Sequence, residues 1–255
     1  MGEAVAKRPV MNVDFVGCGD ACGSGGRFNT CFHVSGQGVD FLIDCGASSL
    51  TALKANQVDL NAVETILVTH FHADHFGGLP FFVLDARFFA KRTATLTVAG
   101  PRGVEARYRR LTEAMFPGSS DAVPPYPLQF VELEPGIARK LGRLSVQAFA
   151  VNHGNEGGPF LGYRIGAGKK TIAYTGDTEW TESLVDLGHD ADLLIAEAYF
   201  HDKKVPLHLD YVSLSKNLER MKPGKVVLTH MSDDMIGREV PPPFQLAHDG
   251  LRIAV

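Results

Sequence analysis

The segment Thr69-His70-Phe71-His72-Ala73-Asp74-His75 gathers three imidazoles and one carboxylate within a few positions. It directly follows the apolar run Ile66-Leu67-Val68, which indicates the end of a buried strand. Imidazole is the commonest metal-binding side chain, and a carboxylate suits a harder second metal ion. A polar, solvated loop is the alternative, but three histidines so close together are a strong bias. The pattern HxHxDH after a strand therefore predicts a metal site.

Composition sets the outer limits on fold and partners. The chain has 255 residues, of which 45% are hydrophobic and 21% charged, an ordinary balance for a globular protein with a sizeable core. The net charge is −4 with His neutral, so a broad nucleic-acid-binding face is not favoured. A local basic patch at Arg102, Arg107, Arg109 and Arg110 is interpreted as a solvated helix face.

Targeting and cysteine patterns point to an intracellular protein. Residues 1–9 contain no apolar signal-peptide core, and no apolar run approaches the length of a membrane span. We therefore expect a cytoplasmic protein with no membrane partner. The four cysteines contain no CxxC pair, which disfavours a zinc ribbon, and they are interpreted as small buried residues or free thiols.

Strand-like and helix-like segments alternate along the chain. Apolar runs and alternating patterns predict strands over residues 10–16, 30–34, 39–43, 65–68, 96–99, 128–133, 144–151, 160–165, 171–174, 191–196, 225–228 and 251–254. Helical periodicity predicts helices over residues 48–57, 77–90, 104–115, 183–188 and 211–221. Neither repeats nor a low-complexity linker interrupt this order. One α/β domain spanning residues 1–255 is the simplest account.

Chemically capable side chains recur where the predicted strands end. Strand ends in layered α/β proteins converge on one rim, where loops build sites. Residues far apart in the sequence can therefore meet in space. A lone histidine at such a position would more often be a core residue, but the shared placement favours a functional site. The residues at predicted strand ends are Asp44, His70, His153, Asp177, Glu197 and His230.

These residues resemble, in type, order and spacing, the five motifs of the metallo-β-lactamase superfamily. The resemblance covers residues 14–230 and implies a four-layer αββα sandwich with a dinuclear metal site at one rim. It implies two Zn²⁺ ions, with Mn²⁺ or Fe²⁺ as alternatives at the second site. The implied ligands are His70, His72 and His153 on the first metal, Asp74, His75 and His230 on the second, and Asp177 between them. Asp44 would lie behind the ligands and orient the histidine loop.

A narrower resemblance points to ribonuclease Z-type members. It rests on Gly23-Ser24-Gly25-Gly26-Arg27-Phe28-Asn29-Thr30, on the segment from Asp74 to Pro80, and on Leu228-Thr229-His230-Met231-Ser232. In that group a histidine paired with a glutamate assists proton transfer, and His208 and Glu197 stand at the matching positions. The local sequence His208-Leu209-Asp210 departs from the group's His-Ser-Thr. The alternative interpretation of His208 and Glu197 is a structural pair on the surface.

The resemblance implies a dinuclear metal-dependent hydrolase, and a phosphodiesterase on small or nucleotide-like substrates is the leading hypothesis. Two metals would hold a bridging hydroxide for attack, with Asp74, His208 and Glu197 as catalytic residues. A transfer-RNA 3′-end endonuclease is an alternative, but no basic protruding arm is evident, so nucleic acid is not favoured as a partner. Lactonase, thioesterase and sulfatase chemistry also stay open, and a metal-binding sensor without turnover ranks last. Degradation of β-lactams is disfavoured because no cysteine lies between His153 and His230.

The sequence says least about the walls of the pocket. We expect them in the loops at residues 116–127, 201–206 and 241–244. Phe116, Tyr126 and Phe244 are predicted either to line an apolar pocket or to pack in the core. A homodimer is consistent with superfamily members of this type, although no feature of the sequence demonstrates one.

Overall fold

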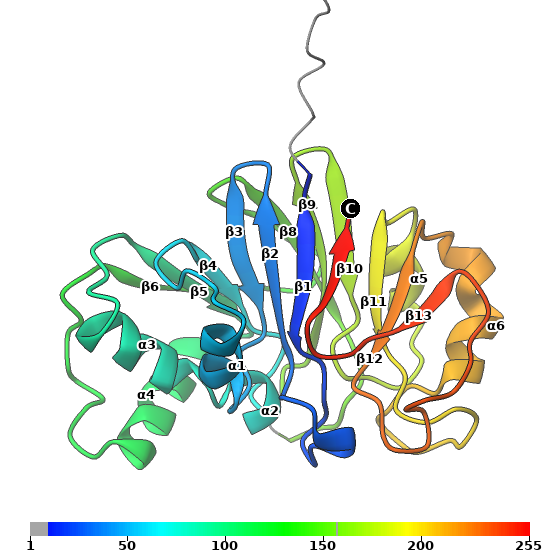
Figure 1. Cartoon of the computed structure of the whole chain (residues 1–255), viewed down its shortest axis with the longest axis horizontal. Coiled ribbons are helices and arrows are strands. Elements are labelled where there is room, and N and C mark those ends of the chain that lie inside the picture. Colours follow the sequence, from blue (N-terminus) through cyan, green and yellow to red (C-terminus); the bar gives the residue numbers. More distant parts are fainter. Residues whose placement is uncertain (1–9, 157) are drawn as a thin grey trace, which may run out of the picture.

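Two seven-stranded sheets pack face to face, and helices cover the outer side of each (Figure 1). The computed structural model describes residues 10–156 and 158–255. This arrangement confirms the predicted α/β, four-layer αββα sandwich. Within the described residues no helix is both long and apolar enough to cross a membrane. The prediction of one domain over residues 1–255 stays a prediction.

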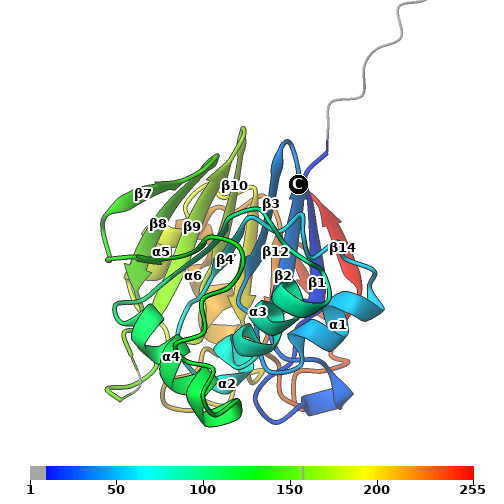
Figure 2. The same cartoon turned by 90° about the vertical axis from the view of Figure 1, so that its left-hand side faces the viewer.

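The first sheet has the order β14-β1-β2-β3-β4-β5-β6. Its strands are β1 (Asn12–Gly17), β2 (Cys31–Gly36), β3 (Val39–Ile43), β4 (Thr65–Leu67), β5 (Leu96–Gly100), β6 (Leu128–Glu132) and β14 (Leu251–Ala254). Strands β3 to β6 pair in parallel, whereas β14, β1, β2 and β3 pair antiparallel. The accompanying helices are η1 (Ser24–Gly26), α1 (Ser49–Ala55), α2 (Ala73–Phe76), α3 (Leu79–Phe88) and α4 (Val104–Met115). Figure 2 shows α1, α3 and α4 over the outer face, with α2 near the lower rim.

The second sheet has the order β13-β12-β11-β10-β9-β8-β7. Its strands are β7 (Ala138–Leu141), β8 (Leu144–Ala150), β9 (Leu161–Ala167), β10 (Lys170–Tyr174), β11 (Leu193–Glu197), β12 (Val226–Thr229) and β13 (Phe244–Leu246). Strands β10 to β13 are parallel, and β7 to β10 are antiparallel. The helices α5 (Ser183–Gly188) and α6 (Tyr211–Met221) cover this sheet (Figure 1). Asp210 caps α6 by accepting a hydrogen bond from the backbone N–H of Ser213 at 2.8 Å.

Three apolar layers hold the sandwich together. The central layer lies between the sheets and contains large aromatic side chains such as Phe15, Phe32 and Tyr174. One outer layer joins the first sheet to its helices, and the other joins the second sheet to α5 and α6. Strands β4, β11 and β12 are buried along their whole length, which explains why they consist mostly of apolar residues.

Parallel pairing fixes where the functional residues lie. Strands β3 and β4 run in the same direction, and so do β8, β10, β11 and β12. Their carboxyl ends meet at one rim of the sandwich, at the bottom of Figure 1. The loops that follow these strands therefore converge from both sheets on one place.

Besides the short 3₁₀ helix η1, three short elements were not predicted. Helix α2 contains Asp74 and His75, residues that the sequence analysis assigned to a loop. Strand β7 has a mostly exposed pattern on the edge of its sheet, so it lacks an apolar signal. Strand β13 begins at Phe244, the last residue of a segment predicted to be a pocket wall. Each is short and is held by pairing or by tertiary contacts rather than by its own propensity.

Gly46 links this framework to the rim. It follows β3, and a Cβ placed on it would lie 2.1 Å from the carbonyl oxygen of Asp74 and 2.5 Å from the Cβ of Asn29. The absence of a side chain lets the backbone of the histidine segment pack directly against the end of β3. Any side chain here would have to displace backbone rather than a flexible side-chain end.

We predict that Gly46→Ala lowers the free energy of unfolding by about 1–3 kcal/mol, because the methyl group overpacks this contact. Gly166→Ala is the matched control, since its Cβ would meet its nearest neighbour at an ordinary 3.6 Å. Urea denaturation of both variants measures the difference. Equal stabilities for the two variants would contradict the close-contact argument.

Candidate metal centre

The predicted ligands converge on the rim from both sheets. From the first sheet, His70 and His72 lie in the loop after β4, and Asp74 and His75 lie in α2. From the second sheet, His153, Asp177 and His230 follow β8, β10 and β12. Their donor atoms form groups in which all lie within 4.8 Å of one another. The sandwich therefore brings together residues that are up to 160 positions apart in the sequence.

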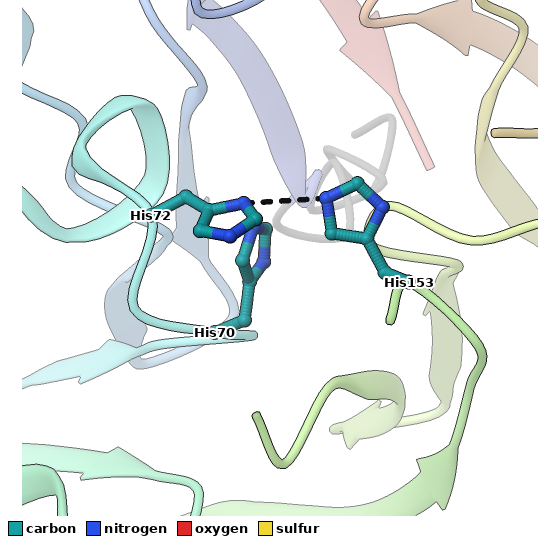
Figure 3. A group of neighbouring side chains, drawn as sticks. All are labelled: His70, His72 and His153. Carbon is teal, nitrogen blue, oxygen red and sulfur yellow. Dashed lines mark hydrogen bonds between the residues drawn. The ribbon is translucent and has the colours of Figure 1, made fainter. Parts of the chain in front are cut away.

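The first group is purely histidine. His72 and His153 point toward one another from opposite loops, and His70 lies beside them (Figure 3). The Nε2 of His153 lies 3.2 Å from the Nδ1 of His72. The Nδ1 of His153 donates to the carbonyl oxygen of Leu207 at 2.8 Å, which fixes the ring and leaves Nε2 facing the group. Three imidazole nitrogens converging in this way are suited to Zn²⁺.

The second group contains two carboxylates and two imidazoles. Oδ2 of Asp177 lies 3.2 Å from the Nε2 of His75 and 3.1 Å from the Nε2 of His230. Oδ2 of Asp74 lies 3.3 Å and 3.2 Å from the same two nitrogens. Asp177 also faces the first group, with Oδ2 at 3.7 Å from the Nε2 of His153. One oxygen of Asp177 is therefore placed between the two groups.

Unpartnered atoms show that this centre fits metal ions. The Nε2 atoms of His70 and His75 and the Oδ1 of Asp177 are buried and make no hydrogen bond among the described residues, because the carboxylate oxygens near the Nε2 of His75 are poorly aligned with it. A buried polar atom without a partner costs about 1–3 kcal/mol. Several such atoms aimed at one another are explained by cations that would bind between them. Their assignment as metal ligands stays a prediction.

The charges in the centre are strongly coupled. Burial lowers the pKa of His70, and neighbouring His75 lowers it further, so this imidazole is neutral and ready to bind a metal. Burial would raise the pKa of Asp177, but the imidazoles of His230 and His75 outweigh it and hold that pKa well below its usual range. Burial opposes charge on His75, yet the carboxylates of Asp177, Asp74 and Asp44 raise its pKa.

Asp44 supports the histidine segment from behind. Its carboxylate accepts hydrogen bonds from the backbone N–H of Thr69 at 2.7 Å and from the Thr69 hydroxyl. It also contacts the Nδ1 of His75 at 2.7 Å, which aims the Nε2 of that ring at the second group. Asp44 is fully buried and adopts a left-handed backbone conformation with φ 59°. Such strained backbone occurs where surrounding structure enforces a function.

The predicted pair His208 and Glu197 also meets at this rim. Oε1 of Glu197 contacts the Nδ1 of His208 and lies 3.4 Å from the Nδ1 of His230. Oε2 of Glu197 accepts backbone N–H groups of Thr178 and Leu209 at 2.8 Å and 3.2 Å. Glu197 is fully buried, so the pair is not a surface pair. Its role in proton transfer stays a prediction.

A cavity of about 280 Å³ opens over the centre, and its walls differ from those predicted. Residues of both ligand groups and His208 form its floor. Ala21 and Cys22 of the glycine-rich loop, together with Tyr199, form walls that the sequence analysis missed. Cys22 lies among glycines, a pattern typical of a wide turn or an anion-binding loop, so the sequence did not single out this loop as a wall.

The pocket-wall predictions were only partly right. Pro206 of the predicted loop at residues 201–206 does line the cavity, and so does the adjacent Leu207, which was not predicted. Tyr126 and Phe244 are buried in the apolar layers beneath the helices, and Phe116 packs edge-on against Phe81. These three aromatics therefore contribute to packing and do not line this cavity.

Comparisons with known proteins identify a family for this chain. Residues 11–241 match the family described as Anti-Pycsar protein Apyc1. The chain belongs to this family. It is 28% identical over 280 residues to a ribonuclease Z of Listeria monocytogenes, covering 87% of this chain and 89% of that protein.

Two solved structures show the same fold. The metallo-β-lactamase fold protein YhfI from Bacillus subtilis superposes with a TM-score of 0.78 at 18% identity, covering 98% of this chain and 100% of that one. Zn²⁺-bound PqqB from Methylobacterium extorquens gives 0.72 at 18% identity, covering 96% and 100%. The superfamily resemblance is thereby confirmed. This member of the Apyc1 family is a metal-dependent hydrolase with the metallo-β-lactamase fold.

We predict that metal uptake by the metal-free protein releases about two protons near neutral pH. Neighbouring carboxylates raise the pKa of both His75 and His230, so both imidazoles hold protons that a metal ion must displace. Metal affinity should therefore increase as the pH rises through neutrality. In the metal-free protein, the stabilisation from these two protonated rings is present at low pH and lost as the pH rises through their raised pKa values.

Isothermal titration in buffers of different ionisation enthalpy counts the released protons. His189→Ala is a control, because this exposed histidine pairs only with Asp190 among the described residues. A metal affinity that does not change with pH would contradict the prediction.

Proposed function

We propose that this protein is a dinuclear metal-dependent phosphodiesterase that cleaves small or nucleotide-like phosphodiesters. The observation that supports this most directly is the shared carboxylate of Asp177, which faces both ligand groups. The pair of His208 and Glu197 borders the same cavity and offers a proton donor beside the two groups. A hydrolase acting on a diester needs both features in one place.

The proposed ligands divide into two sets. His70, His72 and His153 would hold the first metal ion, and Asp74, His75 and His230 the second, with Asp177 shared. When bound, two such cations lower the pKa of a coordinated water and neutralise negative charge on the phosphoryl oxygens. Five histidines favour Zn²⁺, and the Zn²⁺-bound relative PqqB supports this. Mn²⁺ or Fe²⁺ would suit the carboxylate-rich second set.

The remaining residues would move and hold protons. His208 would protonate the leaving oxygen, since the hydrogen bond and negative charge of Glu197 outweigh burial and raise the pKa of this imidazole. Its Nδ1 is engaged by Glu197, so Nε2 is the atom that would deliver the proton. Asp74 would also orient the attacking water, because its Oδ2 and the shared oxygen of Asp177 lie 3.3 Å and 3.2 Å from the same Nε2 of His75.

Transfer-RNA 3′ processing is the second candidate, because several relatives are ribonuclease Z enzymes. The alignment with the Listeria enzyme spans 280 positions, more than the 255 residues of this chain, so that enzyme carries segments without a counterpart here. The net charge of −4 also gives little attraction for a polyanion. Precursor-tRNA binding across a salt series separates the candidates: tight, strongly salt-dependent binding would favour the nuclease.

The metal-loaded protein should cleave bis(p-nitrophenyl) phosphate, and His72→Ala should reduce the rate to that of the uncatalysed reaction. His72 supplies one of three imidazoles of the first group, and its side chain is otherwise exposed, so the variant should fold. Release of p-nitrophenolate and metal content are measured on the same Zn²⁺- or Mn²⁺-loaded sample. Hydrolysis of lactones, thioesters or sulfate esters without diesterase activity would overturn the proposal.

His208→Ala should lower the rate by about 10²–10⁴ for diesters with an alkyl leaving group. It should have little effect on p-nitrophenyl diesters, because p-nitrophenolate leaves without protonation. Comparing both substrate types isolates proton donation from a general loss of structure. Equal losses on the two substrates would assign His208 a structural role instead.

A further inference from the structure

A second cavity adjoins the catalytic one at His208. It has a volume of about 380 Å³ and shares the side chains of Pro206 and His208 with the cavity over the metal centre. None of the proposed metal ligands lines it. We call it the outer cavity. Its size falls within the range of pockets that bind small molecules, roughly 300–1,000 Å³.

The position of this cavity follows from the chemistry proposed above, on which the inference rests. The proton donor must contact the oxygen of the departing alcohol. Since Nδ1 of His208 is held by Glu197, the alcohol must extend from the other edge of this imidazole. The space there has to border His208 without bordering the metal ligands, and the outer cavity meets both conditions.

Trp180 offers this cavity an aromatic surface. It lies in the loop after β10, half-buried, and packs against the apolar layer beneath α6. Its indole Nε1 donates to Oε1 of Glu182 at 3.2 Å, so the polar atom is engaged outside the cavity. The ring itself remains available for contact, and stacking on an aromatic ring is a common way to bind a nucleobase.

The charged residues around the cavity disfavour an anionic occupant. Glu179 and Asp210 contribute two carboxylates, whereas Lys204 contributes one ammonium group. Lys204 is already paired with Asp210 at 3.2 Å and with the hydroxyl of Ser213 at 2.5 Å. The carboxylate of Glu179 is held in place by the side chain of Asn152 and the backbone N–H of Leu207. His208 also lines the cavity, but positive charge on its ring is offset by the carboxylate of Glu197 that it contacts. A further phosphate in this cavity would therefore meet net negative charge.

We propose that the outer cavity binds the leaving alcohol of the substrate and selects an uncharged, aromatic alcohol of the nucleoside type over one that carries another phosphate. The ring of Trp180 supplies the stacking surface. The carboxylates of Glu179 and Asp210 supply the discrimination against charge. A polynucleotide leaving group would carry phosphates into this region and be disfavoured for the same reason.

Trp180 is the only tryptophan of the chain, so its fluorescence reports directly on this cavity. Chelator-treated protein is titrated with adenosine and with adenosine 5′-monophosphate, which makes the readout independent of hydrolysis. We expect a saturable fluorescence change with adenosine and at least about tenfold weaker binding of the monophosphate. Raising the ionic strength should narrow this gap, because salt screens the repulsion. No saturable change, or equal binding of both ligands, would overturn the proposal.

Variants of Trp180 test the site through activity. Inhibition of bis(p-nitrophenyl) phosphate hydrolysis by adenosine should weaken about tenfold in Trp180→Ala and much less in Trp180→Phe, which retains an aromatic ring. Phe89→Ala is the matched control, because this side chain is 76% exposed at the end of α3 and lines neither cavity. Unchanged inhibition in Trp180→Ala would overturn the assignment. Adenosine binding by a protein inert on all diesters would instead overturn the proposed function alone.

Discussion

The buried carboxylate of Asp177 is the charge around which the rim of the molecule is built. It is only 3% exposed, and its Oδ2 lies within 4.0 Å of four imidazoles. Two of these rings come from the first sheet and two from the second. An isolated buried carboxylate would cost several kcal/mol, so these contacts must be preserved. The two sheets are therefore joined at the rim by electrostatics and elsewhere by the apolar layer between them.

Each sheet supplies one further buried carboxylate behind the proposed ligands. Asp44 follows β3 and holds Thr69 and His75, whereas Glu197 ends β11 and holds His208 and His230. Both are fully buried, and both accept backbone N–H groups. The same physical device thus occurs on either side of the centre. A carboxylate that holds the Nδ1 of an imidazole directs the Nε2 of the same ring toward the centre. In this way supporting residues determine the geometry of a metal site.

The central residues were predictable from sequence because two signals coincided. Imidazoles and carboxylates are rare at the ends of apolar strands, and parallel strands share an edge, so His153 and His230 could be placed together without a structure. The residues that form the walls of the cavity over the centre have no such signal in the sequence. Cys22 lies in a glycine-rich loop whose path depends on contacts with β12 and the loop beyond it, including the bond from the backbone N–H of His230 to the carbonyl oxygen of Cys18.

The edge strand β7 was not predicted, and the placement of the aromatic residues was left open, for a related reason. Strand β7 is exposed at most positions and is held by its backbone pairing with β8. The pattern of its side chains therefore does not reveal a strand. Tyr126 and Phe244 could equally have lined a pocket, because hydrophobicity does not specify which apolar layer receives a side chain. Their burial beneath the helices is settled by topology.

The loops after β10 and β11 carry residues of the metal centre and also residues that line the outer cavity. Substitutions at these two kinds of position have very different effects on stability. The loop after β10 holds Asp177 and, three residues later, half-buried Trp180; the loop after β11 follows Glu197 and holds exposed Lys204. Replacing a buried charged residue leaves its partners uncompensated at a cost of about 3–5 kcal/mol, whereas exposed positions change stability by about 0.5 kcal/mol or less. Substitutions in the wall can therefore alter which alcohol is accepted while the metal centre stays intact. The loops after β10 and β11 thus place residues proposed to choose the substrate a few positions from residues proposed to support hydrolysis.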